Sequence, residues 1–473
     1  MNHVWVRLEL AQMSFLQSLE PLCDGHVEAF LPAAEVDQVR RTSADGTWLL
    51  RARHGQQEVA IFWSDFRVNG ASFGGEVARR AVAFLRECQQ RKLPLILVMN
   101  SLGYRFMEGR AGFNDVFSLI PALEYYAQQQ LVISICHGQC LGLGAILFGL
   151  GHYRIGVREE STLNLTGPDV FRLFFGAKVD FSTFASVDQQ YLKTALVHER
   201  TEDLADALTR AATLAHIRRD GLPSTPTAHE SDHGGDFLTR QQQRINAACQ
   251  ELLATFADRQ LELFPGFDSR LRVYLTECDG RLLGVLMNPP ENANNMITVR
   301  TLRLYQDALR LLRVWRLPLL SLLDTPGVDP RIDNSNQDVI HQLIETNRAI
   351  IHYPYPKMGI WSGRGFGGAN TLVIPRCYGS FANYVILDRT RVGVMHESII
   401  AHLLEKSKRM LALWQASREN EAENFSDLVE AGIVTRAIRL EEMGTVIAAF
   451  LRGEITTPEP EPLLEADNEE IYA

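Results

Sequence analysis

Two glycine-rich turns are the segments of this sequence best suited to chemistry. One spans Gly142 to Ala145 and the other spans Gly367 to Ala369. Glycine lets the backbone turn tightly and come close to a ligand. If a helix starts at such a turn, its first N–H groups have no partner within the helix and form an oxyanion hole. Two such turns predict a reaction with two developing oxyanions, although close packing of a helix on a strand explains the glycines equally well.

One literal zinc motif is present, His229-Glu230-Ser231-Asp232-His233. The motif binds zinc only on a helix, where positions i and i+4 share one face. Here Pro223 and Pro226 precede it and Gly234 follows it, which favours a solvated linker. We therefore predict no metal site.

A second literal motif, GxGxxG, covers residues 363–368. A dinucleotide site of this kind also needs an acidic residue about 20 positions further on. That position holds Asn383, so the sequence argues against a nucleotide-binding domain.

Side chains with catalytic potential form no readable constellation. Ser101, Ser362, His137 and Glu108 are available, but no order of nucleophile, base and orienting group can be recognised among them. His137 lies in an apolar run, where a core histidine is more common than a catalytic base. If main-chain amides do the chemistry, this absence is expected.

The chain contains an internal repeat that would position the two turns. Residues 91–103 (RKLPLILVMNSLG) resemble residues 315–327 (WRLPLLSLLDTPG), with an offset of 224 between Pro94 and Pro318. Each run has the look of a buried strand. Amphipathic helices are expected just before them, at 77–90 and 298–316. The same offset places Gly144-Ala145 on Gly368-Ala369, which favours a duplicated α/β unit.

Length and composition fit two large domains. The 473 residues are 46% hydrophobic and carry a net charge of −10. Residues 221–236 are rich in Pro, Gly, Ser and Thr and read as a linker, so we expect domains at 1–235 and 236–473, with an acidic tail at 457–473. An acidic chain is a poor general ligand for nucleic acid or anionic membranes.

Cysteine usage and hydropathy indicate a cytoplasmic protein. The seven cysteines are widely spaced and form no CxxC, which argues against a disulfide framework or a zinc ribbon. The first residues lack the pattern of a secretory signal. The longest apolar stretch, 132–151, contains His137, Gln139 and several glycines, so we do not expect it to span a membrane.

Five or more short motifs, in order, resemble the carboxyltransferase (beta) subunit family of biotin-dependent acyl-CoA carboxylases, which belong to the crotonase superfamily. The order and approximate spacing hold from about residue 57 to residue 450. The motifs are Ser64-Asp65-Phe66, Gly70-Ala71-Ser72, Gly103 through Arg105 to Glu108-Gly109, Thr166-Gly167-Pro168-Asp169-Val170, Asp324-Thr325-Pro326-Gly327 and Phe366-Gly367-Gly368-Ala369.

The resemblance implies an α/β fold of tandem crotonase-like (ClpP/crotonase) domains built from repeated β-β-α units. It implies that the acyl-CoA thioester binds the N-terminal domain and that biotin, carried on a separate chain, binds the C-terminal domain. The active site then lies between the N-terminal domain of one subunit and the C-terminal domain of another, so a homo-oligomer (a dimer or a hexamer) is expected. Biotin carboxylase and biotin carboxyl carrier protein are the implied partners.

The resemblance also assigns site residues. The C-terminal oxyanion hole falls on Gly368 and Ala369, next to Gly367. For the N-terminal hole, counting back from Thr166 without gaps selects Gly142 and Leu143, whereas the internal repeat selects Gly144 and Ala145. Gly103 and Arg105 are the other implied substrate-binding positions.

The N-terminal half departs from the family pattern more than the C-terminal half does. Leu102 stands where the family has glycine, Leu143 adds bulk at the expected hole, and Asn370 replaces a tyrosine. The family's Gly-Gly-Ala-x-Thr-His stretch is replaced by residues 184–188. For the phosphates of coenzyme A, Arg79, Arg80, Arg91 and Lys92 are candidate partners, or simply a solvated helix face.

Three functions remain open at this point. The favoured one is a carboxyltransferase that moves a carboxyl group between carboxybiotin and an acyl thioester through an enolate. The first alternative is a biotin-independent decarboxylase of a malonyl-type thioester on CoA or an acyl carrier protein. The second is a non-catalytic paralogue that assembles with an active subunit.

Overall fold

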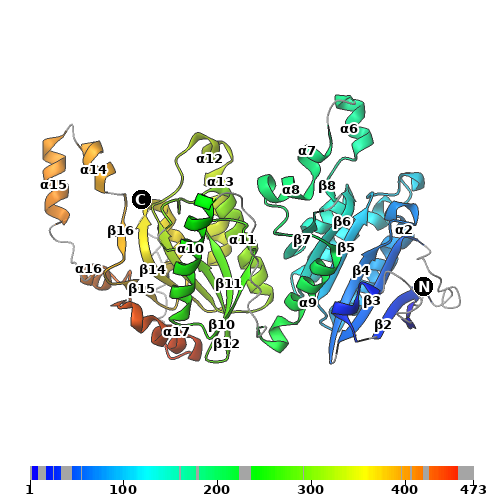
Figure 1. Ribbon diagram of the computed structural model, residues 1–473, viewed down its shortest axis with the longest axis horizontal. Helices are drawn as coiled ribbons and strands as arrows, with labels where there is room; N and C mark the ends of the chain where they lie inside the picture. Colours follow the sequence, from blue (N-terminus) through cyan, green and yellow to red (C-terminus); the bar gives the residue numbers. More distant parts are fainter. Residues whose placement is uncertain are drawn as a thin grey trace, which may run out of the picture. The chain divides into compact units, whose positions relative to one another are not determined.

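The computed structural model describes residues 3–8, 17–24, 26–32, 45–54, 56–158, 161–176, 180–222, 236–290, 292–395, 397–404, 407–418 and 425–455 (Figure 1). The zinc-like motif at 229–233 and the acidic tail lie outside these residues. The chain forms two compact units, Met1–Pro223 and Ser224–Ala473, called here the N-unit and the C-unit. Each unit is built on one sheet.

The sheet of the N-unit changes from antiparallel to parallel along its strand order. The order is β1-β2-β3-β4-β5-β6-β7-β9, with β8 paired to β6. The pairs from β1 to β4 are antiparallel, and those from β4 onward are parallel. The strands are β1 (His3–Leu8), β2 (His26–Pro32), β3 (Thr47–His54), β4 (Gln57–Ser64), β5 (Leu95–Ser101), β6 (Val132–Leu141), β7 (Tyr153–Val157), β8 (Thr162–Asn164) and β9 (Glu199–Thr201).

Helices connect the parallel strands of the N-unit, as parallel pairing requires. Helix α2 contacts β3, α5 contacts β5 and β6, and α9 contacts β6, β7 and β9. The helices are η2 (Glu20–Leu22), η4 (Asn69–Ala71), α2 (Gly75–Gln90), η5 (Phe106–Glu108), α3 (Phe113–Phe117), α4 (Leu119–Ala127), α5 (Leu143–Gly149), α6 (Pro168–Phe175), α7 (Ser182–Ala185), α8 (Val187–Gln189), η6 (Gln190–Thr194) and α9 (Leu204–Asp220).

The sheet of the C-unit has the same plan. Its order is β10-β11-β12-β13-β14-β15-β17, with β16 paired to β14, and it becomes parallel at β12. The strands are β10 (Arg259–Leu263), β11 (Arg272–Cys278), β12 (Arg281–Met287), β13 (Leu319–Thr325), β14 (Lys357–Phe366), β15 (Asn383–Ile386), β16 (Arg391–Gly393) and β17 (Arg436–Ile438). The helices are α10 (Asp236–Ala254), α11 (Val299–Val314), α12 (Ile332–Asn336), α13 (Val339–Ile351), η7 (Gly367–Val373), η8 (Arg376–Tyr378), α14 (Glu397–Leu404), α15 (Lys408–Arg418), α16 (Ser426–Glu430), η9 (Leu440–Glu442) and α17 (Met443–Arg452).

The duplication predicted from the sequence extends to single hydrogen bonds. The Phe73 N–H donates to the Gly103 carbonyl (2.7 Å), and at an offset of 224 the Ile297 N–H donates to the Gly327 carbonyl (2.9 Å). Helices α2 and α11 and strands β5 and β13 keep the same offset. The two expected amphipathic helices are α2 and α11, and the two Leu-Pro-Leu runs lead into β5 and β13.

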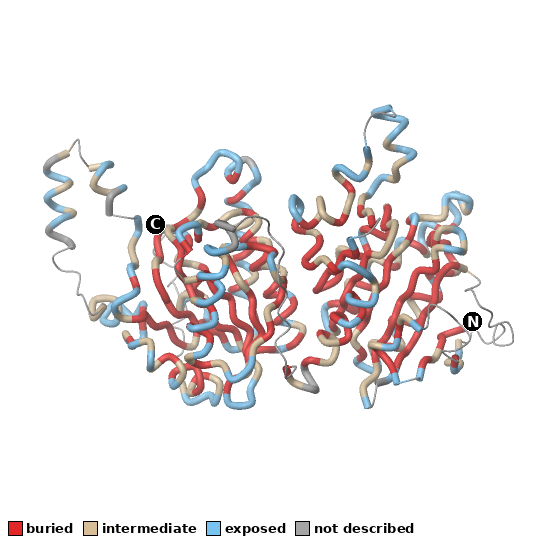
Figure 2. The backbone as a smooth tube through the Cα atoms, viewed as in Figure 1, coloured by how far each residue is buried: buried red, intermediate tan, exposed pale blue. Residues whose placement is uncertain are grey.

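Apolar residues of the sheets form the core of each unit, which Figure 2 shows as buried strands under partly exposed helices. In the C-unit, one cluster joins alternate residues of the strands, such as Leu320, Leu322, Met358 and Ile360, to α10 and α17. Alternate residues of a strand face the same side of a sheet, so α10 and α17 cover one face. Among the described residues, no helix combines the length and the apolar character needed to cross a membrane.

Candidate active site

The first glycine turn joins the longest strand of the N-unit to a short helix. Strand β6 ends at Leu141, and Gly142 follows with φ 54° and ψ −121°. The Gly142 N–H donates to the Asn164 carbonyl (3.0 Å), which ties the turn to β8. Helix α5 begins at Leu143, so the N–H groups of Leu143 and Gly144 lie in its first turn and have no acceptor within the helix.

Gly103 supports this turn from the neighbouring strand. It has φ 87°, and a Cβ atom there would lie 2.8 Å from the Leu141 carbonyl oxygen and 3.2 Å from the Leu143 nitrogen. Its N–H donates to the Ser101 hydroxyl (3.1 Å), which donates to the Ala71 carbonyl (2.7 Å). Only glycine fits at 103, because the site combines positive φ with direct backbone contact. The structure therefore brings two predicted site segments, Gly103 and Gly142–Leu143, into contact.

Arg105 braces the loops beside this turn. Its guanidinium donates to the carbonyls of Asp45 (2.9 Å) and Ser72 (2.7 Å) and lies 3.4 Å from the Glu108 carboxylate. Glu108 in turn accepts from the Gly75 N–H at the start of α2 (2.8 Å). The side chain is only 18% exposed, and its contact with a substrate stays a prediction.

Three of the four candidate cations for coenzyme A lie in ion pairs. The pairs are Arg79–Glu76 (2.6 Å), Arg80–Asp45 (2.6 Å) and Arg91–Glu87 (2.9 Å). Their charges are already balanced within the N-unit, so a role in binding phosphate also stays a prediction.

The second glycine turn follows the corresponding strand of the C-unit and also begins with a positive-φ glycine. Strand β14 ends at Phe366, Gly367 follows with φ 60°, and the 3₁₀-helix η7 begins there. In a 3₁₀-helix each N–H group donates to the carbonyl three residues before it. The N–H groups of Gly367 and Gly368 therefore have no acceptor within the helix. Gly368 is exposed, whereas Ala369 is fully buried. A Cβ at 368 would meet nothing closer than Leu343 Cδ2 at 3.8 Å, so there is free space at the Cβ position of this residue.

Strand register shows which residues of the two turns correspond. Leu141 pairs with Asn164 on β8, and Phe366 pairs with Gly393 on β16. Gly142 thus corresponds to Gly367, an offset of 225 in place of 224. The structural equivalents of Gly368 and Ala369 are therefore Leu143 and Gly144. The sequence left two placements open, Gly142 with Leu143 and Gly144 with Ala145, and the structural pair takes one residue from each. Ala145 corresponds to Asn370.

Packing against β5 limits the size of the residue at 144. A Cβ at 144 would lie 3.4 Å from Ser101 Cβ and 3.5 Å from Met99 Cε on β5. The Leu143 side chain, in contrast, is only 6% exposed and lies in the core. Its bulk is therefore directed into the core, and Gly144 after it is buried as well, whereas Gly142 before it is half-buried.

A charged pair lies behind the second turn and a neutral one behind the first. The Asp324 carboxylate accepts from the Arg364 N–H (2.9 Å) and from Arg364 Nε (2.7 Å). At the corresponding place the Asn100 side-chain oxygen accepts from the Gln139 N–H (3.0 Å). Both pairs hold a bulge in the long strand. Gly363, the first glycine of the nucleotide-like motif, lies in this bulge, and a Cβ there would lie 2.5 Å from Asp324 Cγ.

Side chains near the turns serve the fold. The Ser362 hydroxyl donates to the Leu323 carbonyl (3.2 Å), and Ser101 is bound as described above. Burial lowers the pKa of His137 below its usual 6.5, and its Nδ1 has no hydrogen-bond partner. Because no serine is hydrogen-bonded to this imidazole, the described residues contain no serine–histidine pair here.

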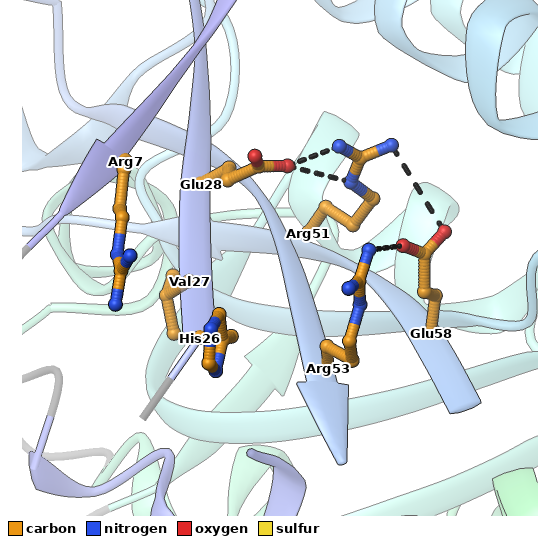
Figure 3. Close-up of a pocket in the computed structure, with 7 residues that line it drawn as sticks. All are labelled: Arg7, His26, Val27, Glu28, Arg51, Arg53 and Glu58. Atoms are coloured by element: carbon orange, nitrogen blue, oxygen red, sulfur yellow. Dashed lines mark hydrogen bonds and ion pairs between the residues drawn. The ribbon is translucent and has the colours of Figure 1, made fainter. Parts of the chain in front are cut away.

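A small cavity of the N-unit lies on the antiparallel strands (Figure 3). It is lined by Arg7 on β1, His26, Val27 and Glu28 on β2, Arg51 and Arg53 on β3, and Glu58 on β4. Arg51 Nε donates to Glu28 (2.9 Å) and Arg53 Nη2 to Glu58 (2.8 Å). The Arg51 guanidinium also lies 4.6 Å from the Trp5 ring centroid. These pairs join the four strands, and no predicted site residue lines the cavity. Among the described residues, no group of acidic, histidine or cysteine side chains is arranged to hold a metal ion.

Comparison with known proteins assigns the chain to a family. The family model described as "Carboxyl transferase domain" matches residues 52–463. The propionyl-CoA carboxylase carboxyltransferase subunit of Haloferax mediterranei is 22% identical, over 70% of this chain and 66% of its own length. The mitochondrial propionyl-CoA carboxylase beta chain of Homo sapiens is 22% identical, over 67% and 61%. The biotin-dependent acetyl-/propionyl-coenzyme A carboxylase beta6 subunit of Mycobacterium bovis is 22% identical, over 81% and 84%.

Solved structures share the fold. Transcarboxylase 12S, with methylmalonyl-coenzyme A and methylmalonic acid bound, superposes with a TM-score of 0.76 at 19% identity, covering 96% of this chain and 91% of that one. A single-chain, multi-domain long-chain acyl-CoA carboxylase superposes with a TM-score of 0.69 at 17% identity, covering 92% and 45%. The predicted fold class, α/β with tandem crotonase-like domains, is confirmed.

The fold and its paired turns define a crotonase-like carboxyltransferase scaffold. Because the family model covers most of the chain, this protein belongs to the carboxyl transferase domain family. The resemblance found in the sequence is therefore confirmed. The matched region spans less than two thirds of the Haloferax mediterranei and Homo sapiens subunits.

Proposed function

We propose that this chain is the carboxyltransferase component of a biotin-dependent acyl-CoA carboxylase. One observation carries the proposal: the two units present equivalent turns, each with a positive-φ glycine and unpaired first N–H groups. Such amides stabilise oxygen that becomes negative during a reaction. In the N-unit, the N–H groups of Leu143 and Gly144 donate to the thioester oxygen and stabilise its enolate.

The C-unit turn fits biotin, because Gly368 is exposed and has free space above its backbone. Gly367 and Gly368 would hold the ureido oxygen. This pair lies one residue before Gly368 and Ala369, the equivalents of Leu143 and Gly144, because the 3₁₀-helix η7 leaves only its first two N–H groups without an internal acceptor. When bound, biotin supplies the carboxyl group from its N–CO₂ bond, and its nitrogen takes up the α-proton of the thioester in exchange. No side-chain base is then required, which agrees with the structural roles of Ser101 and Ser362.

Carboxyl transfer from chemically prepared free carboxybiotin tests the proposal without partner chains. The purified protein is incubated with labelled carboxybiotin and acyl-CoA thioesters of different lengths. We expect a labelled carboxyacyl-CoA and loss of this product in Gly368→Leu, which covers the amide. Release of CO₂ from a malonyl-type thioester without biotin would instead identify a decarboxylase, and no turnover of either kind would identify a non-catalytic subunit.

We also propose that the active assembly is a homo-oligomer, served by a separate biotin carboxylase and carrier protein. Helix α6 buries none of its residues, and Leu173 and Phe174 on it are 85% and 79% exposed. Exposed apolar surface of this kind marks an interface. In the C-unit, Ile399 and Leu403 on α14 are 49% and 62% exposed. Sedimentation of Leu173→Glu/Phe174→Glu should show a smaller species than the parent protein; an unchanged species would contradict the proposal.

A further inference from the structure

Three exposed aliphatic side chains surround the turn of the N-unit. Leu102 is 46% exposed, Ile146 is 40% exposed and Leu165 is 66% exposed. They come from three different segments: the end of β5, helix α5 and the end of β8. Single exposed leucines are common on proteins, but three around one short turn form a local apolar surface.

Backbone contacts fix all three residues to Gly142. Leu102 precedes Gly103, which touches the turn as described above. The Ile146 N–H donates to the Gly142 carbonyl (3.2 Å). A Cβ at 142 would lie 3.7 Å from the Leu165 carbonyl oxygen. Each of the three segments that carry these side chains therefore contacts the turn through its backbone.

Leu102 is also held in place by Gly70. Its N–H donates to the Gly70 carbonyl (3.0 Å), and a Cβ at Gly70 would lie 2.5 Å from Leu102 Cδ1. The leucine side chain thus lies over a glycine that leaves room for it. Its position is set by packing, although nearly half of its surface is free.

The same segments carry no charge. Residues 101–103, 141–148 and 163–168 contain no ionisable side chain. A carboxylate or ammonium group placed against them would lose hydration without gaining a partner. An apolar chain there would gain from burial, by about 0.8 kcal/mol for each CH₂.

We propose that the N-unit turn takes thioesters with an uncharged, apolar acyl chain longer than propionyl, and that Leu102, Ile146 and Leu165 form its first contacts. This inference rests on the proposed function, because it takes the turn as the thioester site. The amides of the turn would bind the oxygen of any thioester, whereas the three apolar side chains would select for the acyl chain.

A chain-length series tests the inference. The full-length protein is assayed with free carboxybiotin and acetyl-, propionyl-, butyryl-, hexanoyl- and octanoyl-CoA. We expect kcat/KM to rise about fourfold for each CH₂ between propionyl and hexanoyl, the factor that corresponds to about 0.8 kcal/mol. Leu102→Ala and Leu165→Ala should each lower kcat/KM for hexanoyl-CoA about tenfold, and by a larger factor than they lower it for propionyl-CoA. Leu192→Ala, which removes the same atoms from an exposed leucine on η6, is the matched control and should change neither.

Other outcomes separate failure of the inference from failure of the function. Equal kcat/KM for all thioesters, or a preference for acetyl-CoA, overturns the inference and leaves the carboxyltransferase intact. If Leu102→Ala and Leu165→Ala lower kcat/KM equally for all substrates and sediment as a smaller species, a second copy of the chain covers these leucines. This result also overturns the inference. If no thioester is carboxylated, the proposed function fails, and the affinity of the same CoA series by calorimetry decides whether longer chains bind more tightly.

Discussion

Gly142 and Gly367 occupy equivalent positions in the two units. Each follows the last residue of a ten-residue strand, and their φ angles are 54° and 60°. The residues after them differ, since buried Leu143 corresponds to exposed Gly368. The backbone of the turn is thus repeated while its side chains have diverged, which is the pattern expected when amides are the functional groups.

Gly368, the exposed residue of the C-unit turn, gives the most direct prediction. Gly368 has ordinary φ and free space at its Cβ position, so Gly368→Ala should fold normally, whereas Gly368→Leu should cover the amide. We expect Gly368→Leu to lower kcat for carboxyl transfer about 100-fold, the typical effect of losing one oxyanion donor. Thermal unfolding midpoints measured beside kcat should stay within a few degrees of the parent.

Gly367→Ala is the contrasting variant at the same turn. Its φ of 60° and a Cβ contact of 3.3 Å with the Val394 carbonyl oxygen make any side chain costly. We expect a loss of about 1–2 kcal/mol in the free energy of unfolding. Equal stability of Gly367→Ala and Gly368→Ala would contradict this account of the turn.

The ion pair behind the C-unit turn predicts energetic coupling. Asp324 and Arg364 can be replaced by the residues that the N-unit uses at the same places, Asn and Gln. Each single change leaves one charged partner, so Asp324→Asn and Arg364→Gln should each cost about 1–3 kcal/mol in the free energy of unfolding. The double variant should cost less than the sum of the two by about 1 kcal/mol or more. Urea unfolding of the four proteins measures this coupling, and strict additivity would exclude it.

Much of the architecture could be predicted because it follows from periodicity and from the repeat. The Leu-Pro-Leu runs lead into β5 and β13, and the amphipathic segments before them are α2 and α11. The strands are buried on both faces and show as continuous apolar runs, whereas each helix buries one face, and a single sequence displays both patterns.

The exact residues of the first turn could not be predicted. One additional residue lies between β13 and β14, so the offset changes from 224 to 225 before Gly367 is reached. Only the pairing of Leu141 with Asn164 and of Phe366 with Gly393 reveals this shift. A shift of one residue changes which amide lies at the start of the helix. The hydrophobic pattern does not reveal such a shift inside a glycine-rich segment.

The supporting pairs were also missed, although a signal existed. At the offset of 224, Asn100 aligns with Asp324 and Ser101 aligns with Thr325, so both strands end in two polar residues. Their partners, Gln139 and Arg364, lie on the next strand, and no local pattern links them. Polar residues at the same place in both copies of the repeat could have indicated that these positions support the turns.

Lys357 predicts a pH dependence of stability. Its ammonium group is buried and donates to the carbonyls of Ile350 (2.6 Å) and Ile351 (3.1 Å) at the end of α13. Burial lowers the pKa of Lys357 to about 8, from 10.5 for a free side chain. Between these values the unfolded chain binds more protons than the folded one, so stability should rise as pH increases from 8 to 10.5, by at most about 3 kcal/mol.

Urea midpoints between pH 7 and pH 10 measure this effect. Lys357→Met removes the titrating group and should flatten the profile over that window, whatever its stability at pH 7. Lys92→Met, which removes an exposed lysine of the N-unit, is the control and should leave the slope unchanged. Identical slopes in Lys357→Met and the parent would contradict the assignment.

Leu143 decides whether the N-unit turn is open to a thioester. Its side chain is buried, so Leu143→Ala should cost about 2–4 kcal/mol in the free energy of unfolding through the cavity it leaves. The main-chain amide remains, and kcat of the folded protein should stay within about threefold of the parent. Leu147→Ala, on the same helix and 2% exposed, removes the same atoms away from the turn and should give the same pair of results. If Leu143 instead obstructed the site, Leu143→Ala would raise kcat above that of Leu147→Ala, and the assignment of the Leu143 and Gly144 amides to the enolate oxygen would be wrong.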